Sequence, residues 1–133
     1  MDANVLFSAL IVNGKTAELL MSDELELFIP ELILAEFAKY KTYLIGKSHR
    51  SETDFYDMLD VFCRKTHVVS ERSLEPFLVQ GKKISPDKDD VHYFAAALLH
   101  NCAIWSNDKQ LKQQVVVEVL STEDLIRRLN FFV

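Results

Sequence analysis

Four acidic side chains could act together chemically, because each comes from a different segment of the chain. They are Asp2, Glu36, Asp90 and Asp108, each near a predicted strand end or on the core-facing stripe of a predicted helix. Two carboxylates about 5 Å apart repel by about 3 kcal/mol at an effective dielectric constant of 20. A marginally stable domain needs protons or cations to offset several such pairs. Oxygen ligands without a neighbouring His or Cys favour Mg²⁺ or Mn²⁺ over zinc.

Glu36 lies within the apolar stripe of a helix predicted from about Glu31 to Ile45. At 100° per residue, Ile33 and Tyr40 fall on the same side of this helix as Glu36. An acid in the middle of such a stripe is not an ordinary solvated residue. The alternative is a glutamate at the rim of the core that pairs with Lys39 or with a distant arginine.

Asp90 shares a helix face with Phe94 in a long helix predicted from Ser85-Pro86 to His100. Acids in a first helical turn complement the helix dipole and cap free N–H groups, which is enough to explain Asp87 and Asp89. Asp90 is harder to explain in this way, because the face that carries Phe94 must pack against the core.

Asp108 ends a polar turn, Ser106-Asn107-Asp108, at the carboxyl end of a strand predicted over Ala103-Ile104-Trp105. Ligands bind at this end of the strands in open parallel sheets. Taken alone, Asp108 is better explained as the N-cap of the next helical turn. Asp2 and Asn4 precede an apolar run and by themselves indicate little.

The elements that must position these acids follow a βαβα rhythm, which favours an α/β fold with a parallel sheet. No linker or repeat divides the 133 residues, so we expect one domain over residues 1–133. The predicted strands are Leu25–Ile29, Thr66–Val69, Ala103–Trp105 and Val115–Val119. The predicted helices are Lys15–Met21, Glu31–Ile45, Ser51–Cys63, Ser73–Gln80, Ser85–His100 and one that begins at Ser121.

Composition excludes several classes of protein. Apolar residues make up 49% and charged residues 26%, as in ordinary globular domains rather than disordered or fibrous chains. No apolar run approaches the about 18 residues that span a bilayer. Cys63 and Cys102 form no CxxC pair, which argues against a disulfide scaffold and favours a cytoplasmic location. The net charge of −5 argues against binding nucleic acid by bulk charge alone.

Four stretches of the chain, taken together and in this order, resemble the PIN domain family. They are Asp2-Ala3-Asn4-Val5-Leu6, Pro30-Glu31-Leu32 with Glu36 after it, Asp87-Lys88-Asp89-Asp90 leading into Tyr93–Leu98, and Ile104–Asp108. The resemblance implies a three-layer α/β/α sandwich on a central parallel sheet. It also implies a metal-dependent endoribonuclease that hydrolyses single-stranded RNA, such as a VapC-like toxin of a toxin–antitoxin pair.

The resemblance also assigns roles to single residues. The acids that would bind Mg²⁺ or Mn²⁺ and carry catalysis are Asp2, Glu36, Asp90 and Asp108. The polar residues that would orient these acids are Asn4 and Ser106. Asp87 matches a further acid that occurs in only part of the family.

The first strand departs from the family pattern. In PIN domains the first metal-binding Asp ends a central apolar strand, whereas only Met1 precedes Asp2 here. Either the start lies upstream, or the strand is shortened and the segment Val5–Leu10 fills part of its place. A shortened strand would remove hydrogen bonds from the middle of the sheet. It would also place the α-amino group beside the metal site, where its positive charge would compete with a cation.

A basic stretch without any acid runs from Phe37 to Ser51, directly after Glu36. Its cations alternate with Tyr40 and Tyr43, a combination that suits contact with the backbone and bases of a single strand. The alternative is that the tyrosines belong to the core and the cations to a solvated face. The candidate RNA-binding residues are Lys39, Lys41, Lys47 and Arg50, with Lys109 following Asp108.

The resemblance implies partners as well, namely a second copy of the chain in a homodimer and an antitoxin whose segment lies in the active-site groove. Phe131, Phe132 and Val133 could form a packing tail or a dimer edge. A different function is a catalytically inactive PIN module that binds RNA or protein. A receiver-like phosphoryl-transfer domain is disfavoured, because Asp54, Asp57 and Asp60 all lie on one polar helix.

Overall fold

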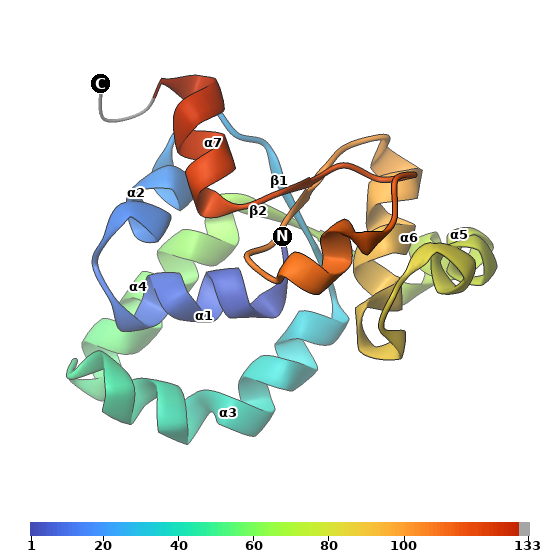
Figure 1. Cartoon of the computed structure of the whole chain (residues 1–133). Helices are drawn as coiled ribbons and strands as arrows, with labels where there is room; N and C mark the ends of the chain where they lie inside the picture. The colour runs from blue at the N-terminus through green and yellow to red at the C-terminus, as the bar shows by residue number, and fades with distance from the viewer. Residues whose placement is uncertain (131–133) are drawn as a thin grey trace.

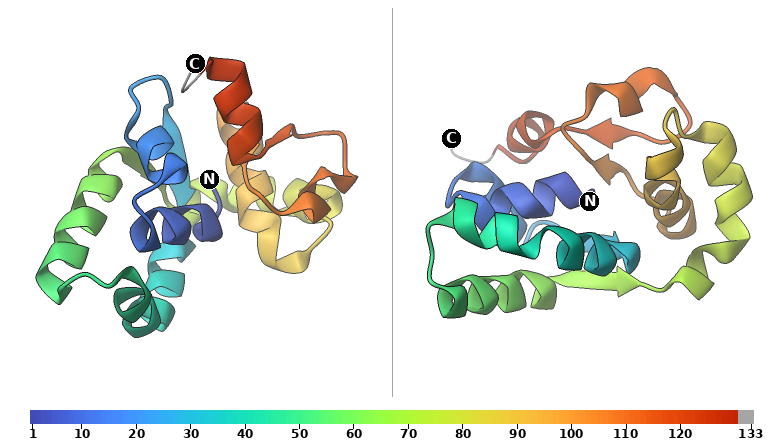
Figure 2. Two further views of the ribbon diagram at one scale, coloured as in Figure 1. Left: turned by 60° about the vertical axis from the view of Figure 1, so that its left-hand side comes forward. Right: turned by 90° about the horizontal axis from the view of Figure 1, so that it is seen from below.

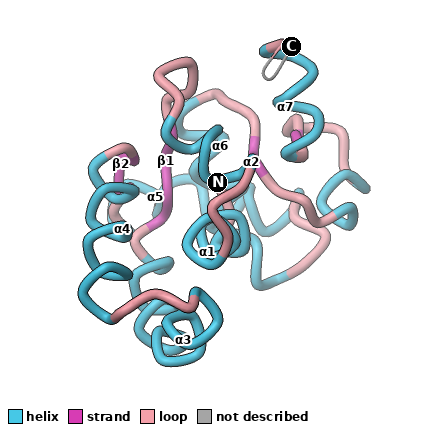
Figure 3. Tube along the Cα trace, turned by 90° about the vertical axis from the view of Figure 1, so that its left-hand side faces the viewer, coloured by secondary structure: helices cyan, strands magenta, loops and turns pink. Residues whose placement is uncertain are grey.

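Helices form most of the chain, with four short strands between them (Figures 1 and 3). The computed structural model describes residues 1–130. The strands are β1 (Leu27–Pro30), β2 (Thr66–Val69), β3 (Ile104–Trp105) and β4 (Val119–Leu120). The helices are α1 (Ala3–Ile11), α2 (Lys15–Met21), α3 (Leu32–Ser48), α4 (Glu52–Arg64), α5 (Glu71–Ile84), α6 (Val91–His100) and α7 (Thr122–Leu129), with 3₁₀ turns η1 (Lys88–Asp90) and η2 (Lys109–Gln113). The predicted α/β class is confirmed.

The strands of the described chain form two separate parallel pairs. In the first pair β1 lies beside β2, with Leu27 opposite Thr66. In the second pair β3 lies beside β4, with Ile104 opposite Val119. Because no strand within residues 1–130 joins β1 to β3, the expected three-layer sandwich on one central sheet is not evident in this arrangement.

Met1 and Asp2 lie in the gap between the two pairs. The amino nitrogen of Met1 donates a hydrogen bond to the carbonyl oxygen of Phe28 in β1, at 3.1 Å. The backbone nitrogen of Asp2 donates to the carbonyl oxygen of Trp105 in β3, also at 3.1 Å. Figure 2 shows the N-terminus between the elements of the first half of the chain and those of the second. Met1 and Asp2 therefore make one hydrogen bond to each strand pair, at the place where a central strand would make several.

The segment after Asp2 is helical, so the prediction that Val5–Leu10 fills part of a strand is wrong. The side chain of Asp2 accepts a hydrogen bond from the backbone nitrogen of Val5 at 3.0 Å and caps α1. The helix contacts α2, α3 and α4, and Val5 and Leu10 are at most 1% exposed. Capping and burial together therefore favour a helix at this point.

Two further boundaries differ from the prediction. The helix that ends at His100 begins only at Val91, because Asp87 caps the preceding turn η1 by accepting a hydrogen bond from the Asp89 nitrogen at 2.8 Å. The predicted last strand is reduced to β4, since Val115 is 97% exposed. In both places a polar or solvated segment makes the element shorter than the sequence pattern predicts.

α5 packs closely against the first turns of α6. Gly81 lies within α5, which continues to Ile84 rather than ending at the glycine as predicted. A Cβ atom on Gly81 would lie 3.0 Å from the carbonyl oxygen of Val91 and 3.2 Å from the nitrogen of Ala95. The absence of a side chain thus lets the first turn of α6, directly after Asp90, approach α5.

The larger core cluster contains Phe55, Phe62 and Phe94, which are at most 1% exposed. None of the helices in residues 1–130 is long and apolar enough to cross a membrane. The apolar residues 131–133, considered above as a packing tail or dimer edge, lie outside the described residues.

We expect Gly81→Ala to lower the free energy of unfolding by about 1–3 kcal/mol, because the new methyl group would press on backbone atoms that cannot move aside easily. Gly46→Ala in α3 is the control, since a Cβ there has no atom within 4 Å. The control should gain up to about 1 kcal/mol from helix propensity. Urea denaturation measures both, and equal losses in the two variants would contradict the packing argument.

Candidate active site

Hydrogen bonds fix both the backbone and the side chain of Asp2, which is 6% exposed. Its backbone is anchored to Trp105, and its Oδ1 atom accepts the hydrogen bond from Val5 that caps α1. This leaves the second carboxylate oxygen without a hydrogen-bond donor among the described residues. Burial lowers the pKa of the neighbouring Met1 α-amino group below its ordinary value, although the charge of Asp2 opposes this shift. The positive charge expected to compete with a cation is therefore weakened.

Asp90 lies at the junction of η1 and α6. Its pKa is raised to about 6, first by burial and then by the negative charges of Asp87, Asp2, Asp108 and Asp89, in that order. These acids come from three regions of the sequence, so the fold brings three of the four predicted catalytic acids into electrostatic contact. Of the charges acting on Asp90, that of Asp87 is the strongest, although its carboxylate also caps η1.

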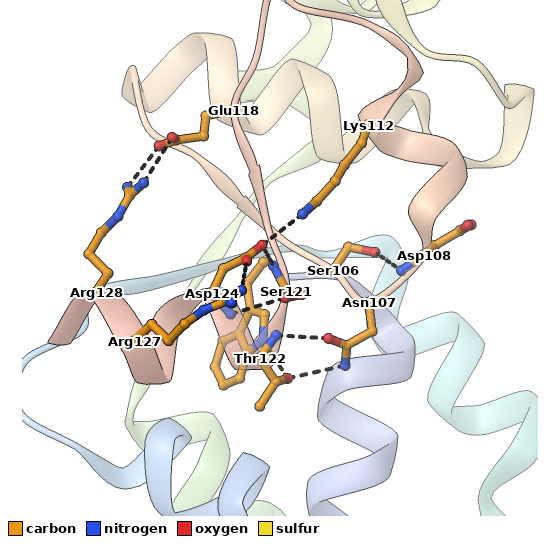
Figure 4. Close-up of polar contacts among 11 residues, drawn as sticks. Ser106, Asn107, Asp108, Lys112, Glu118, Ser121, Thr122, Asp124, Arg127 and Arg128 are labelled. Carbon is orange, nitrogen blue, oxygen red and sulfur yellow. Dashed lines mark hydrogen bonds and ion pairs between the residues drawn. The ribbon is translucent and has the colours of Figure 1, made fainter. Parts of the chain in front are cut away.

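Asp108 is exposed at the end of the loop that follows β3. Its backbone nitrogen donates to the Ser106 hydroxyl at 3.1 Å (Figure 4). Its Oδ1 atom accepts from the Gln110 nitrogen at 3.0 Å. Asp108 therefore caps η2 as predicted, and it also lies near enough to Asp90 for its charge to act on that carboxyl group. Ser106 is 1% exposed and orients the loop through the backbone rather than through the carboxylate of Asp108.

The loop is also fixed to the start of α7. Asn107 accepts a hydrogen bond from the Thr122 nitrogen at 2.8 Å and donates to the Thr122 hydroxyl at 3.1 Å. The indole nitrogen of Trp105 donates to the same hydroxyl at 3.1 Å. Paired contacts of this kind restrict the loop that carries Asp108.

Glu36 faces a groove of about 760 Å³ between α1, α3 and the start of α6. It forms no ion pair among residues 1–130. The alternative, in which Glu36 pairs with Lys39 or with a distant arginine, is therefore wrong for the described residues. Asn4 also lines this groove but makes no side-chain hydrogen bond to an acid within the described chain. Its predicted orienting role stays a prediction.

The basic candidates divide into two groups. Lys39 lines the groove, with its ammonium group 5.3 Å from the centre of the Tyr40 ring, and Lys47 lies 5.9 Å from that of Tyr43. Both tyrosines line the groove and are exposed, at 41% and 60%. Of the basic candidates only Lys39 lines the groove; Lys41, Lys47, Arg50 and Lys109 do not.

Sequence reasoning missed Tyr93 and set Asp89 aside as a dipole-complementing acid. Both line the groove beside Asp90. The signal for Tyr93 was available, because a residue three positions after Asp90 lies on the same helix face.

The acids match a hard divalent ion in chemistry, because they offer only carboxylate oxygens and their repulsion is reflected in the raised pKa of Asp90. Their side chains are not gathered into a finished site. Within residues 1–130, no group of three or more His, Cys, Asp or Glu residues is placed so that it could hold a metal ion. A bound cation would therefore require the acids to turn toward one another.

A family model for the PIN domain matches residues 1–129, so the chain belongs to the PIN domain family. A search among curated proteins and a search among solved structures each found no match. PIN domains are generally nucleases that use divalent metal ions, which places the chain among hydrolases at the level of the family. The match concerns the family alone, and the VapC-like subgroup stays a prediction.

Neutralising Asp90 should stabilise the metal-free protein. Its pKa is about 6 instead of 3.8, so between these pH values the folded protein binds the proton more tightly than the unfolded chain does. The carboxylate therefore destabilises the fold increasingly through this window and in full above it. In EDTA at about pH 7.5, we expect Asp90→Asn to melt above the wild type, and this advantage should fade toward about pH 4.

Thermal denaturation at both pH values measures this effect. Asp57→Asn on α4 is the matched control, because Asp57 is exposed and does not line the groove. A lower melting temperature for Asp90→Asn at neutral pH would show that the carboxylate is not under repulsion.

Proposed function

We propose that the protein is a metal-dependent endoribonuclease that hydrolyses phosphodiester bonds of single-stranded RNA. The observation that carries the proposal is that acids from distant parts of the sequence converge at a groove: Asp90 and Glu36 line it, and, after burial and Asp87, the charges of Asp2 and Asp108 raise the pKa of Asp90. Mutual repulsion of this kind is typical of functional sites, where a charged ligand relieves it. The adjoining groove offers room for a nucleic-acid strand.

The proposed ligands of one or two Mg²⁺ or Mn²⁺ ions are Asp2, Glu36, Asp90 and Asp108. When bound, such an ion supplies positive charge at the phosphate and makes a water molecule more acidic. Glu36 or Asp90 accepts the proton of the water that attacks phosphorus. The bond from phosphorus to the 3′ oxygen then breaks. Asn4 and Ser106 keep the acids in place, and Asp87 adds negative charge.

Substrate contact would use the basic and aromatic side of α3. Lys39 and Lys47 provide positive charge next to exposed Tyr40 and Tyr43, and the segment from Phe37 to Ser51 contains no acid. Because the net charge is −5, this local surface rather than the whole molecule would attract RNA. Lys41, Arg50 and Lys109 would extend it beyond the groove.

We extend the proposal to the toxin of a toxin–antitoxin pair, acting as a homodimer in the cytoplasm. Support for the location comes from Cys63 and Cys102, which are both free thiols. An antitoxin segment would occupy the same groove as RNA.

A second candidate function is a PIN module that binds RNA or protein without cleaving it. The observation that favours it is that the acids in residues 1–130 do not form a ready metal site. Addition of Mn²⁺ separates the two functions, because an ion that binds only the folded state raises the melting temperature. The inactive module would show no such rise.

We expect Mn²⁺-dependent cleavage of a single-stranded RNA oligonucleotide that stops in EDTA. Asp90→Asn and Asp108→Asn should each lower the rate at least about 100-fold, because each removes a charge from the proposed ion site. Asp57→Asn makes the same chemical change on the exposed face of α4 and should cleave at the wild-type rate. Undiminished cleavage by Asp90→Asn would end the assignment.

Replacing both Lys39 and Lys47 by Gln should weaken binding of a single-stranded oligonucleotide in EDTA. The slope of log Kd against log salt should decrease by about 1 to 2, since two phosphate contacts are lost. Arg64→Gln is the control, because Arg64 pairs with Asp60 on α4, away from the groove. Fluorescence anisotropy at several salt concentrations measures the slope, which stays unchanged if these lysines are only a solvated face.

A further inference from the structure

Tyr93 is a polar side chain on the otherwise apolar inward face of α6. It is 7% exposed, and its neighbours Phe94 and Ala97 on that face are at most 4% exposed. One side of the residue lines the groove that contains Glu36, and the other lines an apolar cavity of about 180 Å³ beside Met1. Its ring therefore separates the groove from the gap between the two strand pairs.

The hydroxyl of Tyr93 joins two elements that carry proposed ligands. It accepts a hydrogen bond from the backbone nitrogen of Ala3 at 3.0 Å. Ala3 is the first residue of α1 and directly follows Asp2, while Tyr93 lies in α6 three residues after Asp90. Because Asp2 already caps the nitrogen of Val5, the Ala3 nitrogen depends on Tyr93 for its partner.

The hydroxyl is surrounded by negative charge from three elements. Burial raises the pKa of Tyr93 above its ordinary value, the Ala3 nitrogen opposes this shift, and Asp2, Asp90 and Glu36 add to the rise. Tyr93 therefore keeps its proton at neutral pH and remains a donor. Within residues 1–130 this proton has no acceptor at hydrogen-bond distance, so it is available to a carboxylate that turns toward it.

We propose that Tyr93 is a positioning residue: its hydroxyl, anchored by the Ala3 nitrogen, donates its one proton to the carboxylate of Asp2 or of Asp90 and so fixes these two acids around the divalent ion. This inference rests on the proposed function. A neutral phenol is a poor ligand for Mg²⁺ or Mn²⁺ beside four carboxylates, so Tyr93 acts through the acids. Partners that orient metal ligands in this way commonly contribute about 10- to 100-fold to metal affinity.

The test is titration of the full-length protein with MnCl₂ by isothermal calorimetry, without RNA. We expect Tyr93→Phe, which removes only the hydroxyl, to weaken Mn²⁺ binding at least about 10-fold. Cleavage of RNA should return to near the wild-type rate at saturating Mn²⁺. Tyr56→Phe is the matched control and should bind as the wild type does, because Tyr56 lies on α4 and does not line the groove.

Ala3→Pro tests the anchor without changing the phenol. Proline is tolerated at the first position of a helix and removes the N–H group that holds Tyr93. The extended backbone of Asp2, with φ −80° and ψ 165°, suits a residue before proline. We expect this variant, too, to bind Mn²⁺ at least about 10-fold more weakly, so the inference remains testable if Tyr93→Phe does not fold.

The outcomes separate this inference from the proposed function. If the wild type binds Mn²⁺ and a folded Tyr93→Phe binds it equally well, the role of Tyr93 is overturned and the nuclease proposal stands. If the wild type binds no Mn²⁺, both are overturned. A variant that melts earlier but keeps its Mn²⁺ affinity shows a purely structural hydroxyl and also overturns the inference.

Discussion

Two backbone hydrogen bonds at the start of the chain connect the two halves of the molecule. Met1 reaches the first strand pair through Phe28, and Asp2 reaches the second through Trp105. The same residue that makes the second contact caps α1 and presents a carboxylate to the candidate site. Folding and proposed chemistry therefore depend on one short segment. Any shift of this segment would change the separation of the strand pairs and the position of the acid together.

The repulsion on Asp90 opposes stability, whereas hydrogen bonds beside the acids stabilise the segments that carry them. Polar contacts fix the loop before η2, where Asn107 pairs with Thr122, and the start of α7, where Ser121 and Asp124 form a capping box (Figure 4). These contacts lie beside Asp108 rather than among the acids. The acids thus keep a mutual repulsion that a bound ligand would relieve, while hydrogen bonds to Thr122 and within the capping box stabilise the neighbouring segments.

Much of the fold was predictable, because caps and apolar periodicity act over a few residues. Ser51 and Ser121 begin their helices as predicted. The strand pairing was not predictable, since the gap beside Met1 depends on contacts between distant segments. For the site, the sequence predicted Glu36 on a core-facing stripe, whereas Glu36 lines an open groove beside the exposed Tyr40 and Tyr43. It also predicted Asp90 near other acids, and the charges of Asp2 and Asp108 do act on it. It could not give the separations among side chains on different elements, which decide whether an ion is held, and it overlooked the hydroxyl of Tyr93.

The enclosed α-amino group has a practical consequence for handling the protein. Met1 is 9% exposed, and its nitrogen is bonded to Phe28 between the strand pairs. The linker of any affinity tag fused ahead of Met1 must pass between the two strand pairs. There it contacts β1, β3 and the carboxylate of Asp2. A purification handle at that end would act as an added structural element rather than a passive label.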